Sequence, residues 1–188
     1  GPGARAAGMG EAYGPVAEGA EAVYWNPAGL AGISRPELAY SHIEMLRFFH
    51  HDHLAYAHPV PFLHGALGSG LTMFYQDSLD LLSNTNQNLG KYGAHSEAFS
   101  LAYARSFGVG EDYREGDKAY FQDNWNIAGD YRPLDRRGDL WTGTLDMGLA
   151  LKAVQESVYD KRASAFAADG GVLFKHQDYE NLSLSFAF

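Results

Sequence analysis

The residues with the clearest capacity for chemistry are the histidines of the stretch HHDH, at positions 50–53. On a β-strand, His51 and His53 point to the same side two residues apart, so their imidazoles could bind one divalent ion together with a third ligand. A polar cluster at the rim of the sheet, next to a turn, would have the same composition without binding a metal. We therefore expect no metal at His50–His53, although the sequence alone leaves this question open.

Other patterns point weakly to catalysis or ion binding. The stretch DNWNIAGD, at 123–130, has Asp and Asn at spacings similar to those of a calcium loop, but it lacks the full ligand order and the distal glutamate. No serine stands in a Gly-x-Ser-x-Gly context, and the chain has no cysteine. We expect a protein that is not an enzyme and that needs no cofactor.

The elements that must position these residues are β-strands. Large apolar residues alternate with small ones in four segments, 97–107, 144–159, 163–176 and 181–188. This period of two puts successive side chains on opposite faces of a strand. Three less regular segments, 37–46, 53–60 and 65–76, also indicate strands, and 7–16 could add an eighth.

The contrast between the two faces suggests the environment of these strands. In 144–159, Leu149 and Leu151 share one face, whereas Ala150 and Lys152 share the other. A soluble β-sandwich, which is the alternative, turns its large residues inward and carries a richly charged outer face. Small, weakly polar residues on the second face instead favour an antiparallel transmembrane β-barrel, whose large residues meet outer-membrane lipid.

Hydropathy and charge argue against two further classes of protein, helical membrane proteins and nucleic-acid-binding proteins. No apolar run is long enough for a membrane-spanning helix. The net charge of −9 argues against a nucleic-acid partner, because no basic stripe is available to contact phosphates. Two long connections, 77–96 and 108–143, are rich in polar and charged residues and are expected to be loops at one rim.

The opening segment, 1–35, differs from the rest because it is rich in Ala and Gly. Asn26 can cap a helix and Pro27 suits a first helical turn. The pair is therefore expected to end one short element, 17–25, and to begin another, 27–31, which Gly32 closes. A kinked surface helix would be the simpler interpretation of an isolated Asn-Pro pair.

The surroundings of that pair resemble a known family. GARAAGMG at 3–10 and YWNPAGL at 24–30 resemble the N-terminal region of FadL-type outer-membrane transporters and of their PorV/PorQ-like relatives. The resemblance implies that 1–35 folds inside a barrel as a hatch and that 36–188 supplies strands. The residues implied for hatch gating are Tyr24, Trp25, Asn26, Pro27, Ala28, Gly29 and Leu30.

The resemblance also raises a question of size. An eight-stranded barrel is filled by its own side chains and leaves no room for such a hatch. FadL-type barrels have about fourteen strands, so the chain is expected to be part of a larger barrel. The alternative is a complete chain, because the end LSLSFAF resembles a C-terminal barrel-assembly signal. With no signal peptide present, a mature protein of the bacterial outer membrane is expected.

Two functions follow from the resemblance. The first is hatch-gated passage of hydrophobic or amphipathic small molecules. The second is a non-transporting barrel subunit that binds partners of an outer-membrane secretion machine of the type IX kind. For the second function, the partner surface would lie in 108–143, with these aromatic residues as candidates: Tyr113, Tyr120, Phe121, Trp125 and Tyr131.

Overall fold

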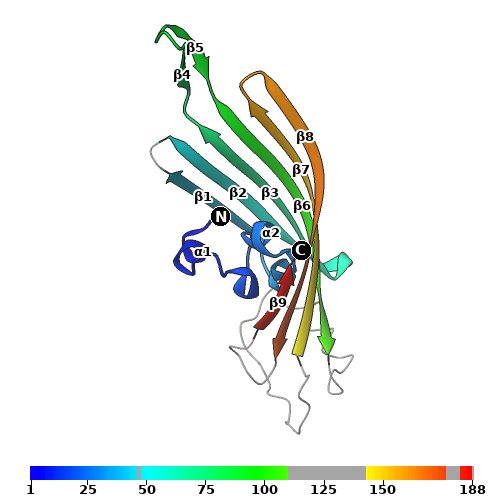
Figure 1. Cartoon of the computed structure of the whole chain (residues 1–188). Coiled ribbons are helices and arrows are strands. Elements are labelled where there is room, and N and C mark those ends of the chain that lie inside the picture. Colours follow the sequence, from blue (N-terminus) through cyan, green and yellow to red (C-terminus); the bar gives the residue numbers. More distant parts are fainter. Residues whose placement is uncertain (46–47, 110–142, 177–182, 188) are drawn as a thin grey trace.

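The computed structural model describes residues 1–45, 48–109, 143–176 and 183–187. Within these residues the chain is an all-β protein with a few short helices (Figure 1). The strands are β1 (Glu37–Met45), β2 (Phe49–Val60), β3 (Gly65–Gln76), β4 (Leu79–Leu82), β5 (Asn88–Tyr92), β6 (Ala94–Val109), β7 (Gly143–Val158), β8 (Lys161–His176) and β9 (Ser183–Ala187).

Seven of these strands form one antiparallel sheet in the order β1-β2-β3-β6-β7-β8-β9. The order follows the chain, so neighbouring strands are joined without a crossover. The strands β4 and β5 form a separate hairpin between β3 and β6, and Figure 1 shows it projecting beyond the end of the sheet. In the described part of the chain the sheet is open, with β1 and β9 at its two edges. A closed barrel is therefore not present in these residues.

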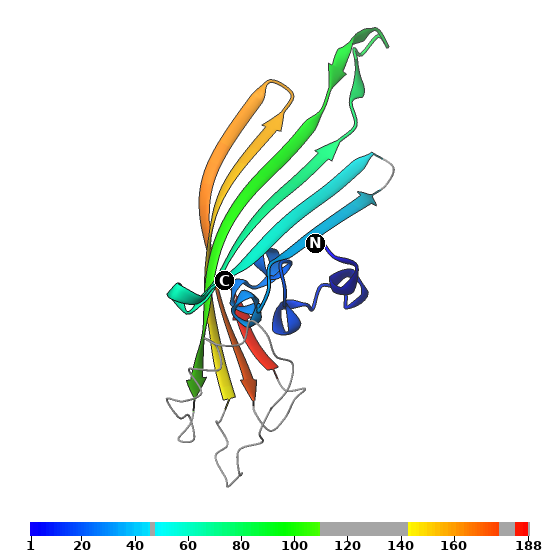
Figure 2. The ribbon, with the colours of Figure 1, turned by 180° about the vertical axis from the view of Figure 1, so that it is seen from behind.

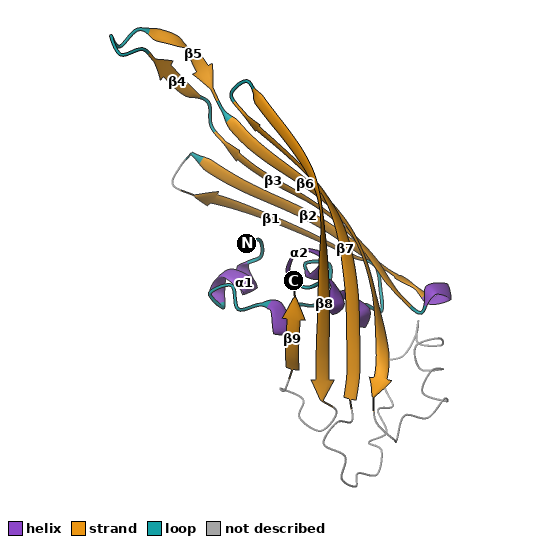
Figure 3. Cartoon of the chain, turned by 45° about the vertical axis from the view of Figure 1, so that its right-hand side comes forward, coloured by secondary structure: helices purple, strands orange, loops and turns teal. Residues whose placement is uncertain are grey.

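The N-terminal segment lies in the hollow of the curved sheet (Figure 2). Its elements are α1 (Ala4–Gly8), η1 (Gly14–Val16), α2 (Ala22–Trp25) and η2 (Pro27–Gly32), and a further single turn, η3 (Pro61–Leu63), joins β2 to β3. Seen from the side in Figure 3, the four N-terminal elements stand between β1 and β9. The sheet therefore curves around them, and we call residues 1–35 the hatch.

The two faces of the sheet differ as the alternation predicts. On the outer face, which points away from the hatch, Phe166 is 91% exposed and Leu151 is 61% exposed. On the inner face, Ala150 is fully buried and Asp146 is 2% exposed. The core consists mainly of alanines of the sheet packed against small and aliphatic residues of the hatch. The interior is thus built from small side chains because the hatch backbone occupies the space.

Some boundaries differ from the sequence-based expectations. The interpretation of 7–16 as an eighth strand is wrong, since this stretch holds the end of α1, turns and η1. The strand predicted at 53–60 begins earlier, at Phe49, so HHDH lies within β2 rather than at a turn. The connection 77–96 contains the hairpin β4–β5 and the start of β6. Most of the connection 108–143 lies outside the described residues. The expectation that both connections lie at one rim is wrong, because 77–96 leads into the start of β6 and 108–143 follows its end, at opposite ends of the sheet.

Candidate functional site

The junction between α2 and η2 forms the centre of the contact between hatch and sheet. Asn26 has an extended backbone and caps η2, because its side-chain Oδ1 accepts a hydrogen bond of 3.1 Å from the backbone N–H of Ala28. Its Nδ2 donates a bond of 3.2 Å to the carbonyl of Gly14. This buried amide therefore ties three elements of the hatch together, and both of its polar atoms have partners. The predicted cap at Asn26-Pro27 is confirmed, although α2 is shorter than the expected 17–25.

Glycines of the sheet let the hatch backbone approach closely. A Cβ added at Gly148 would lie 2.3 Å from the carbonyl carbon of Pro27, and one added at Gly171 would lie 2.0 Å from Asn26 Oδ1. On β3, a Cβ at Gly68 would lie 2.5 Å from a methyl group of Val23. These positions exclude any side chain unless the hatch moves. The Gly-rich stretch GALGSG, at 65–70, is compatible with either a bend or close packing, and the structure shows close packing at Gly68 and Gly70.

The seven expected hatch residues lie together against the sheet. Five of them are buried: Asn26, Pro27, Ala28, Gly29 and Leu30. The other two, Tyr24 and Trp25, are half-buried and stack edge to face, with ring centroids 5.3 Å apart. Their role in gating stays a prediction. The five aromatic residues proposed for a partner surface, from Tyr113 to Tyr131, lie outside the described residues, as does the stretch 123–130.

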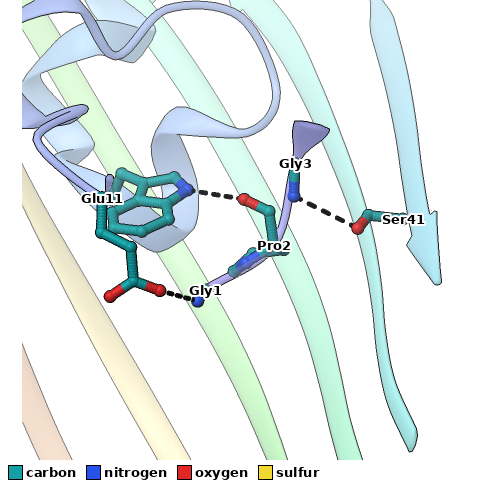
Figure 4. Close-up of polar contacts among 6 residues, drawn as sticks. Gly1, Pro2, Gly3, Glu11 and Ser41 are labelled. Carbon is teal, nitrogen blue, oxygen red and sulfur yellow. Dashed lines mark hydrogen bonds and ion pairs between the residues drawn. The ribbon is translucent and has the colours of Figure 1, made fainter. Parts of the chain in front are cut away.

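The first residues of the hatch are held by side-chain and backbone bonds (Figure 4). The indole N–H of Trp25 donates to the carbonyl of Pro2 at 3.0 Å, and the backbone N–H of Gly3 donates to Ser41 Oγ of β1 at 3.2 Å. Arg5 pairs with Glu18 within the hatch. These contacts hold α1 beside α2 and connect the hatch to the edge strand β1.

Two ion pairs join β7 to β8, one on each side, along the strands, of the positions where η2 contacts the sheet. Lys152 pairs with Asp169, and Lys175 Nζ lies 3.1 Å from the buried Asp146 Oδ2. Asp146 also accepts a hydrogen bond from Ser106 of β6. Because Asp146 and Asp169 each have a cationic partner, their burial is compensated. The positions between the pairs, such as Gly148 and Ala150, are small and receive η2.

The ring of Tyr24 is surrounded by side chains of the inner face. It lies edge to face with His53 at 5.4 Å and with His51 at 6.3 Å, and the ammonium of Lys152 is 5.7 Å from its centroid. Burial raises the pKa of the Tyr24 phenol above its ordinary value. We call His51, His53, Lys152 and Asp169 the Tyr24 cradle.

The alternation of side chains along β2 decides on which face each residue of HHDH lies. His51 and His53 do share one face, as expected, but that face is turned toward the hatch, whereas His50 and Asp52 are on the outer face. In the described ranges, no three or more His, Asp or Glu residues are grouped so that they could hold a metal ion. Sequence reasoning missed the contact of both histidines with Tyr24. The signal was available, because they continue the inner-face series of Ala55 and Ala57.

The outer face carries aligned rows of side chains across five strands. One row is apolar and consists of Leu54, Leu71, Phe99, Ala153 and Phe166. The next row toward the hairpin is mostly polar and consists of Asp52, Met73, Glu97, Gln155 and Ser164. The change between these rows occurs at the same level on four of the five strands, the exception being β3, where Met73 continues the apolar series, so it marks one boundary across most of the sheet.

The apolar part of the outer face can be measured along β7. From Leu145 to Ala153 every outward residue is apolar, and Gln155 follows. Eight residue steps span about 27 Å along a strand, or about 20 Å after a tilt of 40°. One charged residue departs from this pattern on β6, where Arg105 stacks over Phe107 with its guanidinium 5.0 Å from the ring centroid. A long side chain of this kind can lie along apolar surface while its charge reaches water.

A pocket of about 420 Å³ lies between the hatch and β1. Its lining includes three carboxylates, from Glu18, Glu21 and Glu37, together with the ammonium of Lys175. Charged walls suit water and polar groups rather than an apolar molecule.

None of the helices in the described residues has the length and hydropathy that a membrane-spanning helix needs. Comparison of the chain with protein-family models, with curated proteins and with solved structures found no match.

Proposed function

We propose that this chain forms part of a bacterial outer-membrane β-barrel similar to the FadL-type and PorV-like proteins, with residues 1–35 as a hatch that controls the passage of hydrophobic or amphipathic small molecules. One observation carries the proposal. The sheet exposes its large apolar side chains on the face opposite the hatch and packs its alanines and glycines against the hatch. A lipid-facing wall with a plugged interior accounts for both faces at once.

The dimensions of the outer face support the membrane assignment. An apolar band about 20 Å tall, bounded by a polar row, approaches the band of about 25 Å that outer-membrane barrels present to lipid. Open edges at β1 and β9 leave room for further strands, as a barrel of about fourteen strands would require. In water, an exposed apolar surface of this extent would instead favour aggregation or a protein partner.

The membrane assignment can be tested on two positions of β7. We would attach a bimane fluorophore to L151C or Q155C in the otherwise cysteine-free chain and add vesicles with brominated acyl chains. Strong quenching at 151 and weak quenching at 155 is the expected result, because only Leu151 lies within the apolar band. Equal, weak quenching at both positions would contradict a lipid-facing sheet.

Passage can be tested by stapling the hatch to the sheet. A Cβ at position 70 would lie 3.1 Å from Val23 Cγ1, which is close enough for a disulfide between V23C and G70C. Cells that produce the stapled protein should take up less of a neutral hydrophobic dye, and reduction should restore uptake. The single variants V23C and G70C serve as controls. Uptake that is unchanged by a complete staple would refute hatch-gated passage.

The charged pocket between hatch and β1 favours a second function, a barrel subunit that binds secretion-machine or other outer-membrane proteins without transporting a ligand. A pocket with three carboxylates is a poor path for an apolar passenger. In that case a chain lacking 110–142 should lose a stable protein complex, while the staple should change nothing. Neither function requires a reaction, so we assign no enzymatic activity.

A further inference from the structure

The Tyr24 cradle contains a buried imidazole whose hydrogen bonds are incomplete. His53 is 2% exposed, and its Nδ1 lies 2.9 Å from Thr72 Oγ1 of β3. Its Nε2 is buried and has no hydrogen-bond partner among the described residues. A neutral imidazole tolerates this arrangement, because one nitrogen can remain an unused acceptor. A protonated imidazole has two N–H donors, and the one on Nε2 would be left without an acceptor.

The charges around His53 also disfavour a second proton. His51 of the same strand and Lys152 of β7 lie nearby, and the carboxylate of Asp169 on β8 is already paired with Lys152. Thr72 contributes only a hydroxyl group. On the hatch side, Tyr24 presents a neutral ring, and the charged groups are Glu11 and the amino group of Gly1, which pair with each other. No carboxylate in this set is free to compensate a new positive charge.

The hatch is attached to the sheet in two different ways. From Asn26 to Leu30 all five residues are buried, with the backbone of Pro27 and Ala28 against Gly148 and the side chains of Asn26 and Leu30 against Gly171 and Gly68. Tyr24 is held only through its side chain, which is half-buried in the cradle. Loss of the cradle contact would therefore weaken the attachment of the part of the hatch before Asn26, which is otherwise held by Val23 against Gly68 and Gly70 and by the bond from Gly3 to Ser41.

We propose that Tyr24 and its cradle form an acid-sensitive latch, which holds the first part of the hatch at neutral pH and releases it when His53 takes up a proton. The proton comes from solvent and binds the free nitrogen of the ring. The resulting imidazolium is stable only if Tyr24 moves away and admits water to Nε2. This inference rests on the proposed function, because it assigns the hatch a condition for opening.

The experiment follows the solvent access of Trp25, which packs on Tyr24 and Tyr13. The other two tryptophans are replaced by phenylalanine in the full chain, which is folded into lipid vesicles. Acrylamide quenching of Trp25 is then measured from pH 8 to pH 4.5. We expect the ratio of released to held hatch to rise about tenfold or more across this range, with a midpoint near or below the ordinary histidine value of about 6.5.

Three variants decide the result. H53Q should abolish the transition, whereas H50Q, on the outer face of the same strand, should leave it unchanged. K152Q should move the midpoint to higher pH, because it removes a neighbouring positive charge and frees Asp169 to pair with the imidazolium. Far-UV circular dichroism checks that each variant is folded. A flat profile in the parent, or the same profile in H53Q, would overturn the latch.

Failure of the latch can be told apart from failure of the proposed function. Quenching of Trp25 reports the packing around Tyr24 and Tyr13 in the hatch, so it does not depend on what passes through the barrel. Dye uptake by the V23C/G70C staple tests passage at constant pH. A pH-independent Trp25 together with blocked uptake in the stapled protein would refute the latch and leave the hatch function intact.

Discussion

Replacement of Gly148 by alanine is the most direct test of how the hatch is seated. A Cβ at this position would lie 2.3 Å from the Pro27 carbonyl carbon and 2.4 Å from the Ala28 nitrogen. Ordinary contact begins near 3.4 Å, so the hatch would have to retreat by about 1.1 Å. Both obstructing atoms belong to the backbone and cannot rotate out of the way.

The loss of docking free energy in G148A can be estimated from the cost of adding volume to a packed core. Extra volume in a well-packed core costs about 1–3 kcal/mol, which lowers the ratio of docked to undocked hatch by about 5-fold to 150-fold. The strand itself should not weaken, because alanine loses less backbone entropy than glycine when it is ordered. The cost therefore falls on the contact between hatch and sheet.

The assay uses the absence of cysteine from the chain. Val23 is 1% exposed and contacts Gly68 and Gly70, so a thiol in V23C reacts with maleimide only when the hatch is undocked. G148A should raise the labelling rate of V23C by about 5-fold to 150-fold. G93A is the matched control, since the nearest atom to its new Cβ is 3.8 Å away. Equal labelling rates in G148A and G93A would refute the close seating of the hatch.

Three further predictions use the same protein. Asn26→Ala leaves the buried backbone N–H of Ala28 without a partner, which costs about 1–3 kcal/mol, whereas the Gly14 carbonyl still accepts from the backbone N–H of Ala17. The thiol-labelling assay should therefore show a faster rate than in the parent. Because burial raises the pKa of the Tyr24 phenol, the contribution of this side chain to docking is complete below about pH 10 and is lost as pH rises through the raised value. Y24F should remove part of an alkaline increase in Trp25 quenching. On the outer face, L149R should lower the free energy of folding into vesicles by about 2–4 kcal/mol, measured by urea titration in lipid, while Q155R should have a much smaller effect. Equal losses for L149R and Q155R would contradict the depth of the apolar band.

Local sequence patterns were enough to locate most strands. Alternation between large and small residues depends only on the two-residue period of a strand, so β6, β7 and β8 were predicted from a single segment each. The hairpin β4–β5 was not predicted, because its exposed residues lack an alternating pattern. The segment 7–16 was wrongly considered as a strand, since its Ala and Gly content is compatible with several conformations.

The candidate site was predicted in part. Asn26-Pro27 carries its own signal, because capping is a local interaction between a side chain and the next backbone N–H groups. Glycines within strands are compatible with a bend or with close packing. The identity of their partners was not available, since Gly148 and Pro27 are far apart in the sequence.

The sequence by itself determined that this chain forms strands with one large and one small face, and that a capped break at Asn26-Pro27 divides its opening segment. Only the tertiary structure decided which face the hatch covers, that His51 and His53 surround Tyr24, and that Lys152 pairs with Asp169. The physical reason is the sequence separation over which each kind of interaction acts. Periodicity and capping act within a few residues, whereas register and docking depend on contacts between distant segments, which no local pattern encodes.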